Sequence, residues 1–298
     1  MSLVATPGLR VSNTPRRLAQ VLLPAFALIA LAVTGPPAGA GEARGVDALA
    51  DVDGPLVVAA QRLSALETPA TVGPGARMVF FGDSLGGDIA SGLVPEATRR
   101  GAQVIQDTRP GCSNIDGVGT FDSGKVIPWM PGCLDYLLST WRSRVAATPA
   151  DAVVWLSSFD ASKRLLDGVI ADPGTVDGRE RIAAAIRESA DIVAPPGSGR
   201  RVVFLLPSAF PPSAGGGGPS AESVIDVQRH RAIMHLVVRS DPARFSMLML
   251  DRFLCPAGPP CPLEPAPGFA PRPPDGGHVN PEGGAWLAPQ ILDTLGVS

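Results

Sequence analysis

Five short apolar runs, separated by longer segments of helical pattern, constrain the fold of this chain more than any other feature. The runs are RMVFFG (77–82), AQVIQD (102–107), DAVVWLSS (151–158), RVVFLLPS (201–208) and FSMLMLD (245–251). The helical segments are 86–100, 132–147, 176–194, 220–240 and 281–295. Apolar strands that alternate with helices are typical of a parallel sheet that is covered on both faces. The sequence therefore predicts an α/β fold, a three-layer α/β/α sandwich with a five-stranded parallel sheet.

Composition supports a sizeable core and excludes one class of partner. The chain has 298 residues, of which 45% are hydrophobic and 18% are charged. Its formal net charge of −3 offers no basic surface for a phosphate backbone, so nucleic acid is excluded as a partner. The Gly215–Gly218 run lacks the Lys-Ser/Thr of a P-loop, so it is interpreted as a loop and not as a phosphate site.

The first 40 residues have the order of a secretory signal. Three arginines precede the apolar stretch 18–33, and small residues follow it, with a fitting cleavage site at 38–40. An uncleaved membrane anchor is the alternative, but a span needs about 20 residues, and this stretch is short and contains Pro24. Either reading places the rest of the chain outside the cytoplasm, secreted or tethered. The expected division is a signal or anchor at 1–40, a linker at 41–75 and one domain at 76–298.

Export also determines how the four cysteines are interpreted. Four cysteines allow three pairings, and the two local ones, Cys112–Cys133 and Cys255–Cys261, each close a short loop around Pro and Gly. In an oxidising compartment we expect these two disulfides. A zinc site is the alternative, but the chain offers no CxxC and no neighbouring histidine with ligand spacing, so no metal is expected.

Ser84 lies where a ligand site is expected. In doubly wound sheets ligands bind at the carboxyl ends of the strands, and Ser84 follows the first run in FFGDSLGG, just before a helix. A backbone N–H near a helix N-terminus stabilises developing negative charge. Serine alone is a poor nucleophile and needs a base. Without one, Ser84 is more simply a turn or capping residue.

Three histidines are the candidates for that base. His230 and His235 lie five residues apart on an expected helix and are interpreted as ordinary helix residues. His278 lies in a Gly- and Pro-rich loop before the last helix, three residues after Asp275. A carboxylate so placed can accept the imidazole Nδ1–H and stabilise the imidazolium. Ser84, Asp275 and His278 are therefore the predicted Ser-His-Asp triad.

Two sequence blocks carry a family resemblance. FFGDSLGG and DGGHVNPEG together resemble the first and last blocks of the GDSL/SGNH hydrolase superfamily, which has a flavodoxin-like sandwich. More narrowly, RPGCS, DAVVWLSSFDASKRL and LCPAGPPCP are similar to the extracytoplasmic SGNH domains that are fused to, or work beside, membrane acyltransferase-3 proteins. The resemblance covers about residues 76 to 295.

The resemblance implies a role for each matching residue. Ser84 becomes the nucleophile, His278 the general base and then acid, and Asp275 the residue that orients His278. The backbone N–H groups of Ser84 and Gly111 become the donors of the oxyanion hole. Asp83 is given a turn-holding role.

One position departs from the family pattern. The superfamily has Gly-x-Asn-Asp after the third strand, whereas this chain has Ser157-Ser158-Phe159-Asp160. Phe159 stands where the Asn donor belongs, and a missing oxyanion donor costs about 10²–10³ in rate. The substitutes considered are the side chains of Asn114, Ser157 and Ser158. The alternative is an oxyanion hole with two backbone donors only.

The resemblance and the expected location imply a function. It is a serine esterase or O-acyltransferase that needs no cofactor and acts on short, acetyl-like esters of cell-envelope or polysaccharide sugars. Water as acceptor gives an esterase and a sugar hydroxyl gives a transferase, and the triad is the same for both. The alternative is a non-catalytic SGNH-fold module that binds glycan or a membrane acyltransferase partner, which Phe159 favours. A secreted lipase is a weaker alternative, because no exposed apolar stripe is evident.

Overall fold

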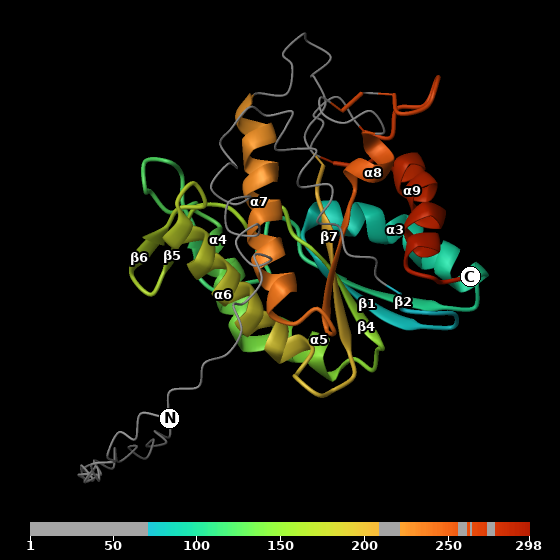
Figure 1. Cartoon of the computed structure of the whole chain (residues 1–298), viewed down its shortest axis with the longest axis horizontal. Helices are drawn as coiled ribbons and strands as arrows, with labels where there is room; N and C mark the ends of the chain where they lie inside the picture. Colours follow the sequence, from blue (N-terminus) through green and yellow to red (C-terminus); the bar gives the residue numbers. More distant parts are fainter. Residues whose placement is uncertain (1–70, 209–220, 256–260, 263, 273–277) are drawn as a thin grey trace, which may run out of the picture. The chain divides into compact units, whose positions relative to one another are not determined.

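The computed structural model describes residues 71–208, 221–255, 261–262, 264–272 and 278–298 (Figure 1). These residues all belong to one unit, Ala43–Ser298. In this part of the chain, every helix is too short or too polar to span a bilayer. Four expectations lie outside the described residues: the signal or anchor, most of the linker 41–75, the Gly215–Gly218 run and Asp275.

The predicted five-stranded parallel sheet is confirmed. Its strands run in the order β2-β1-β4-β7-β8, and each neighbouring pair is parallel. They are β1 (Arg77–Gly82), β2 (Gln103–Thr108), β4 (Ala152–Leu156), β7 (Arg201–Leu206) and β8 (Phe245–Met249). After β1, the chain forms β2 on one side of β1 and then crosses to form β4 on the other side. The carboxyl end of β1 is therefore a topological switch point, where open α/β sheets bind ligands.

Helices form over each of the five predicted segments. They are α3 (Ser84–Arg99), α4 (Met130–Tyr136), a π-helical turn η1 (Leu137–Trp141), α5 (Arg142–Ala147), α6 (Val176–Val193), α7 (Ala221–Ser240) and α9 (Pro281–Thr294). A short helix that was not predicted, α8 (Asp251–Leu254), follows β8. Three of the starts have a side-chain cap: the side chains of Asp83, Thr175 and Asn280 accept from the N–H groups of Gly86, Gly178 and Gly283.

The alternation of side chains along β1 explains why both faces of the sheet are covered. Met78 and Phe80 point into the core that contains α3 and α9. Val79 and Phe81 point into the opposite core, which η1, α5, α6 and α7 complete. Figure 1 shows the same division, with α9 beside α3 and with α6 and α7 across the sheet. Because both faces are buried, the strands are apolar throughout, as the sequence indicated.

A second, smaller sheet was not predicted. It is antiparallel and contains β3 (Val118–Gly119), β5 (Arg164–Leu166) and β6 (Val169–Ala171) in the order β3-β5-β6. Strands of two or three residues produce no periodic run that a sequence pattern can reveal. Two predicted strands also end early, at Leu156 and Leu206, so the serines that follow each of them lie in loops at the carboxyl edge of the main sheet.

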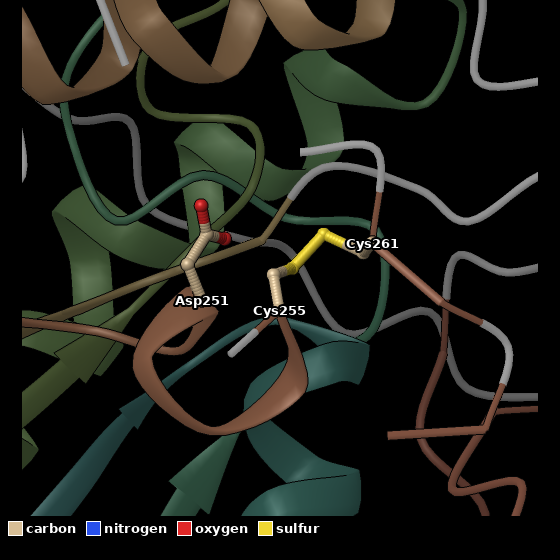
Figure 2. Close-up of side chains that lie close together, drawn as sticks. All are labelled: Asp251, Cys255 and Cys261. Atoms are coloured by element: carbon tan, nitrogen blue, oxygen red, sulfur yellow. A yellow bond between two sulfur atoms is a disulfide. The ribbon is translucent and has the colours of Figure 1, made fainter. Parts of the chain in front are cut away.

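Both expected disulfides are present, Cys112–Cys133 and Cys255–Cys261. Figure 2 shows the second one at the end of α8, with the carboxylate of Asp251 nearby. The possible ligand atoms of Asp251, Cys255 and Cys261 lie within 4.8 Å of one another. The two sulfurs are bonded to each other, so they supply no thiolate for a metal. This cluster is therefore a disulfide beside a carboxylate.

Candidate active site

Ser84 and His278 come together at the switch point of the sheet. Ser84 Oγ lies 3.1 Å from His278 Nε2, although the two residues are 194 positions apart in the sequence. Ser84 is the first residue of α3 and is partly exposed, and His278 is exposed three residues before the start of α9. This distance allows direct proton transfer from a serine hydroxyl to an imidazole. Asp275, the third member of the predicted triad, lies outside the described residues.

The turn before Ser84 requires glycine at position 82. A Cβ atom on Gly82 would lie 2.1 Å from the carbonyl oxygen of Leu156, at the end of the neighbouring strand β4. That same oxygen accepts a hydrogen bond from the Asp83 N–H at 3.2 Å. The end of β4 therefore lies directly against the turn that presents Ser84.

A close helix pair positions His278 relative to Ser84. A Cβ atom on Gly92 of α3 would lie 2.2 Å from the carbonyl oxygen of Gly284 in α9, so the two backbones are almost in contact. Before α9 begins, the N–H of Val279 lies 3.4 Å from Oδ2 of Asp88 in α3. The residue next to His278 is thus held on the helix that begins with Ser84.

Asp83 connects the Ser84 turn to the loop that follows β4. Its carboxylate is fully buried, and Oδ1 accepts from the N–H of Gly86 at 3.2 Å. Oδ2 accepts from both the N–H and the Oγ–H of Ser158, at 2.8 Å and 2.6 Å. Burial raises the pKa of Asp83, and the hydrogen bonds from Ser158 oppose that shift. The sequence suggested the turn-holding role but not the second attachment to Ser158.

A second buried carboxylate, Asp160, joins the same loop to the loop after β2. Asp160 accepts from Trp155 Nε1 at 2.6 Å, from Ser113 Oγ at 2.8 Å and from Asn114 N at 2.8 Å. Arg164 is also fully buried and donates to Ser113 Oγ at 3.1 Å. Burial raises the pKa of Asp160 and lowers the pKa of Arg164 to about 10, while their mutual attraction opposes both shifts. The two loops that flank Ser84 are therefore tied together below the surface.

Gly111, a predicted donor of the oxyanion hole, lies in a loop with a defined backbone conformation. Gly111 has φ +72°, a left-handed conformation that favours glycine. Its carbonyl oxygen accepts from Trp129 Nε1 at 3.0 Å, which fixes the orientation of the loop. Among the described residues, no partner occurs for the N–H of Ser84 or of Gly111. Within that part of the chain, both groups are available as donors to an incoming oxygen atom.

The three side chains considered as substitute donors have other partners. Asn114 is completely buried and its Nδ2 donates to the carbonyl of Phe81 at 3.2 Å. Ser157 is buried and its Oγ donates to the carbonyl of Cys112 at 3.3 Å. Ser158 donates to the buried carboxylate described above. In this arrangement the two backbone N–H groups are the better candidates for an oxyanion hole.

A cavity of ≈ 380 Å³ lies next to the Ser84 turn, and we name it the side pocket. Leu85, the residue after Ser84, and Ser158 belong to its lining. The rest is formed by the carboxyl end of β7, the small sheet and α7. Its lining includes Leu85, Thr120, Ser158, Lys163, Ser208 and His230. His230 was expected at an ordinary helix position, and no sequence pattern indicated this pocket.

One comparison with known proteins identifies the family of the chain. A family model described as "SGNH domain (fused to AT3 domains)" matches residues 59–293. Among curated proteins, none matches the chain significantly. One similar solved structure is the periplasmic domain of a lipopolysaccharide acetyltransferase from Salmonella ser. Paratyphi A, at 12% identity and TM-score 0.48, with 86% of this chain and 97% of that chain covered.

Another similar structure is a carbohydrate acetylesterase family member from Sinorhizobium meliloti. It has 16% identity and a TM-score of 0.43, and the match covers 74% of this chain and 100% of that chain. At these identities and TM-scores, neither likeness supports a conclusion about the substrate of this chain.

Proposed function

Because the chain belongs to the family of SGNH domains that are fused to AT3 domains, we propose that it is a serine esterase or O-acyltransferase for short acyl esters of cell-envelope or polysaccharide sugars. The observation that carries this proposal is the 3.1 Å distance between Ser84 Oγ and His278 Nε2. The position of this pair at the switch point of the sheet supports it, because ligands of open α/β sheets bind there.

The proposed reaction proceeds in two acyl-transfer steps. His278 Nε2 accepts the proton of the Ser84 hydroxyl as Oγ attacks the ester carbonyl carbon. The oxygen that becomes negative receives hydrogen bonds from the N–H groups of Ser84 and Gly111. His278 then returns the proton to the departing alcohol, and an acyl-enzyme remains on Ser84.

In the second step, water or a sugar hydroxyl attacks the acyl carbonyl carbon and transfers its proton to His278. The bond from the carbonyl carbon to Ser84 Oγ breaks, and Oγ recovers a proton from His278. Water releases a free acid, and a sugar hydroxyl yields a new ester. Asp275 belongs to this proposal as the carboxylate that orients His278.

The proposal includes a location and a partner. The N-terminal segment is proposed to export or tether the chain, which fits the two disulfides, because disulfides persist in oxidising compartments. The family description names fusion to AT3 domains, so a membrane acyltransferase is the proposed source or recipient of the acyl group.

A second candidate function is a non-catalytic module with the same fold. Phe159 offers no donor where the family has Asn, and the nearby polar side chains donate elsewhere. Such a module would bind glycan or the membrane partner and leave acyl groups untouched.

Hydrolysis of p-nitrophenyl acetate tests the proposal. The wild type, Ser84→Ala and His278→Ala are compared with Ser143→Ala, which changes an exposed helix serine on α5. We expect both site variants to lose at least about 10³-fold in kcat/KM and the control to match the wild type. A wild type no faster than Ser84→Ala would refute the enzyme and favour the binding module. Saccharide acceptors added to the wild type then separate the two activities, because a transferase diverts acetyl groups from water.

A further inference from the structure

Arg109 begins the turn that contains Gly111, in the loop that follows β2. Its N–H donates to the carbonyl oxygen of Gly82, at the end of β1, at 2.7 Å. Its own carbonyl oxygen accepts from the N–H of Cys112 at 3.3 Å, which closes the turn. Proline at the second position of this turn, and a glycine with φ +72° at the third, are typical of a type II turn. The backbone of Arg109 is therefore fixed between the end of β1 and the Gly111 loop.

An anchored aromatic ring holds the guanidinium of Arg109. Its Cζ lies 3.9 Å from the centre of the Tyr136 ring, at the end of α4. The Tyr136 hydroxyl accepts from Arg144 Nη1 at 2.7 Å, and Arg144 Nε donates to Asp107 Oδ2 at 2.8 Å. Because the ring is fixed by these contacts, the guanidinium that packs on it is oriented before any ligand binds.

Within the described residues, no carboxylate neutralises the charge of Arg109. Its side chain forms neither a hydrogen bond nor an ion pair in this part of the chain, and its contact is with the Tyr136 ring. Arg144, the other cation at that ring, is paired with Asp107. Asp135 precedes Tyr136 and is exposed, and it too lacks an ion pair among the described residues. The partly exposed guanidinium of Arg109 thus has donors available for a ligand.

An oriented guanidinium without a carboxylate partner indicates an anionic ligand. Arginine presents its N–H groups in a planar fork that matches the oxygens of a carboxylate or a phosphate. Arg109 and Gly111 belong to one turn, and the N–H of Gly111 is a proposed donor of the oxyanion hole. An ester whose carbonyl oxygen is bound at Gly111 would therefore pass beside Arg109.

We propose that Arg109 is a specificity-determining residue that binds a carboxylate or phosphate group carried by the ester substrate. The fork of Arg109 donates paired hydrogen bonds to the anion, while the face of the guanidinium stays on Tyr136. This inference rests on the proposed function, because it adds the charge of the substrate to the same reaction. The protein should then prefer acidic esters to neutral esters of the same shape.

The test measures binding on the Ser84→Ala protein, so that it does not depend on catalysis. The probes are 4-acetoxybenzoate, 4-acetoxyphenyl phosphate and the neutral 4-acetoxybenzamide, and NMR titration yields each Kd. We expect an anionic probe to bind more tightly than the neutral one, and the carboxylate and phosphate probes show which anion is preferred. Adding Arg109→Gln should raise the Kd of the preferred anionic probe roughly 3- to 10-fold and leave the Kd of 4-acetoxybenzamide unchanged.

Lys125→Gln is the matched control. Lys125 is exposed and forms no ion pair among the described residues, and its substitution changes the net charge by the same amount. It should leave every Kd unchanged. Arg109→Lys keeps the charge without the planar fork, so its Kd for the anionic probe should lie between those of the Ser84→Ala parent and Arg109→Gln.

Three results would each overturn the proposal: equal Kd values for the anionic and neutral probes, an Arg109→Gln variant that binds the anionic probe as the parent does, or an equal loss in Lys125→Gln. Urea unfolding of each variant shows that it is folded, and Arg109→Lys retains the test if Arg109→Gln does not fold. A wild type that fails to hydrolyse p-nitrophenyl acetate would refute the proposed function and leave these binding results intact.

Discussion

The contact between α3 and α9 can be tested with a single methyl group. A Cβ atom on Gly92 would lie 2.2 Å from the carbonyl oxygen of Gly284, 2.3 Å from its carbonyl carbon and 2.7 Å from the nitrogen of Ala285. All three are backbone atoms, so no side chain can rotate away. Because an ordinary contact begins at 3.4 Å, Gly92→Ala must separate the two helices by about 1.2 Å at this point, the difference between 3.4 and 2.2 Å.

Two effects of Gly92→Ala follow from that displacement. Overpacking costs about 1–3 kcal/mol, and three backbone clashes place this site at the upper end, whereas replacing a helical glycine by alanine recovers about 1 kcal/mol. We expect a net loss of about 2 kcal/mol in the free energy of unfolding. Because Ser84 begins α3 and His278 precedes α9, the 3.1 Å distance between them should also increase. A misplacement of about 1 Å can cost about 10²-fold in rate.

Urea unfolding and p-nitrophenyl acetate hydrolysis measure the two effects separately. Gly284→Ala is a milder comparison, because its Cβ would lie 2.9 Å from the carbonyl oxygen of Asp88. Gly132→Ala on α4 is the matched control, since nothing lies within 4 Å of its Cβ, and it should gain up to about 1 kcal/mol. If Gly92→Ala unfolds at the urea concentration of the wild type, the helices are not in the close contact described. If it also hydrolyses at the same rate, that contact does not position the pair.

Three further results are expected. Replacing Cys112 and Cys133 together by Ser opens a loop with a sequence separation of 21 and should cost roughly 3 kcal/mol in urea unfolding. Burial lowers the pKa of His230 from 6.5 to about 3, so only the unfolded chain binds that proton at pH 5. Between pH 8 and pH 5 the wild type should therefore lose about 2 kcal/mol relative to His230→Phe, measured by unfolding at each pH. Trp129→Phe removes the hydrogen bond to the Gly111 carbonyl and should lower kcat about 10-fold, less than the full loss of an oxyanion donor, with little change in the urea midpoint.

The main sheet and its helices could be predicted because each leaves a local signal. Strands that are buried on both faces form continuous apolar runs, and β1 begins and ends at the residues that its run predicted. The helix starts at Ser84 and Pro281 are marked by the capping residues Asp83 and Asn280. The proximity of Ser84 and His278 could be predicted because both were expected in loops at the same edge of the sheet.

The remaining features depend on which loops become neighbours in space. In the sheet, β1 lies between β2 and β4, and no local sequence pattern indicates that order. The bonds from Ser158 to Asp83 and from Asn114 to Asp160 join residues 75 and 46 positions apart. The side pocket depends on the same assembly, because its lining comes from loops beside two sheets and from the helices α3 and α7.

The loop that carries Phe159 stabilises the neighbouring loops, and this contribution does not require the Asn side chain of the family pattern at position 159. The N–H of Phe159 donates to Ser157 Oγ at 3.3 Å, and its carbonyl oxygen accepts from Arg164 at 2.6 Å. The residues on either side reach inward, Ser158 to the carboxylate before Ser84 and Asp160 to the loop after β2. The loop thus helps to hold the Ser84 turn and the Gly111 loop in position, and in the proposed reaction charge stabilisation falls to the backbone N–H groups. A site built in this way forgoes up to about 10²–10³ in rate. For the proposed esterase or O-acyltransferase we therefore expect slow turnover.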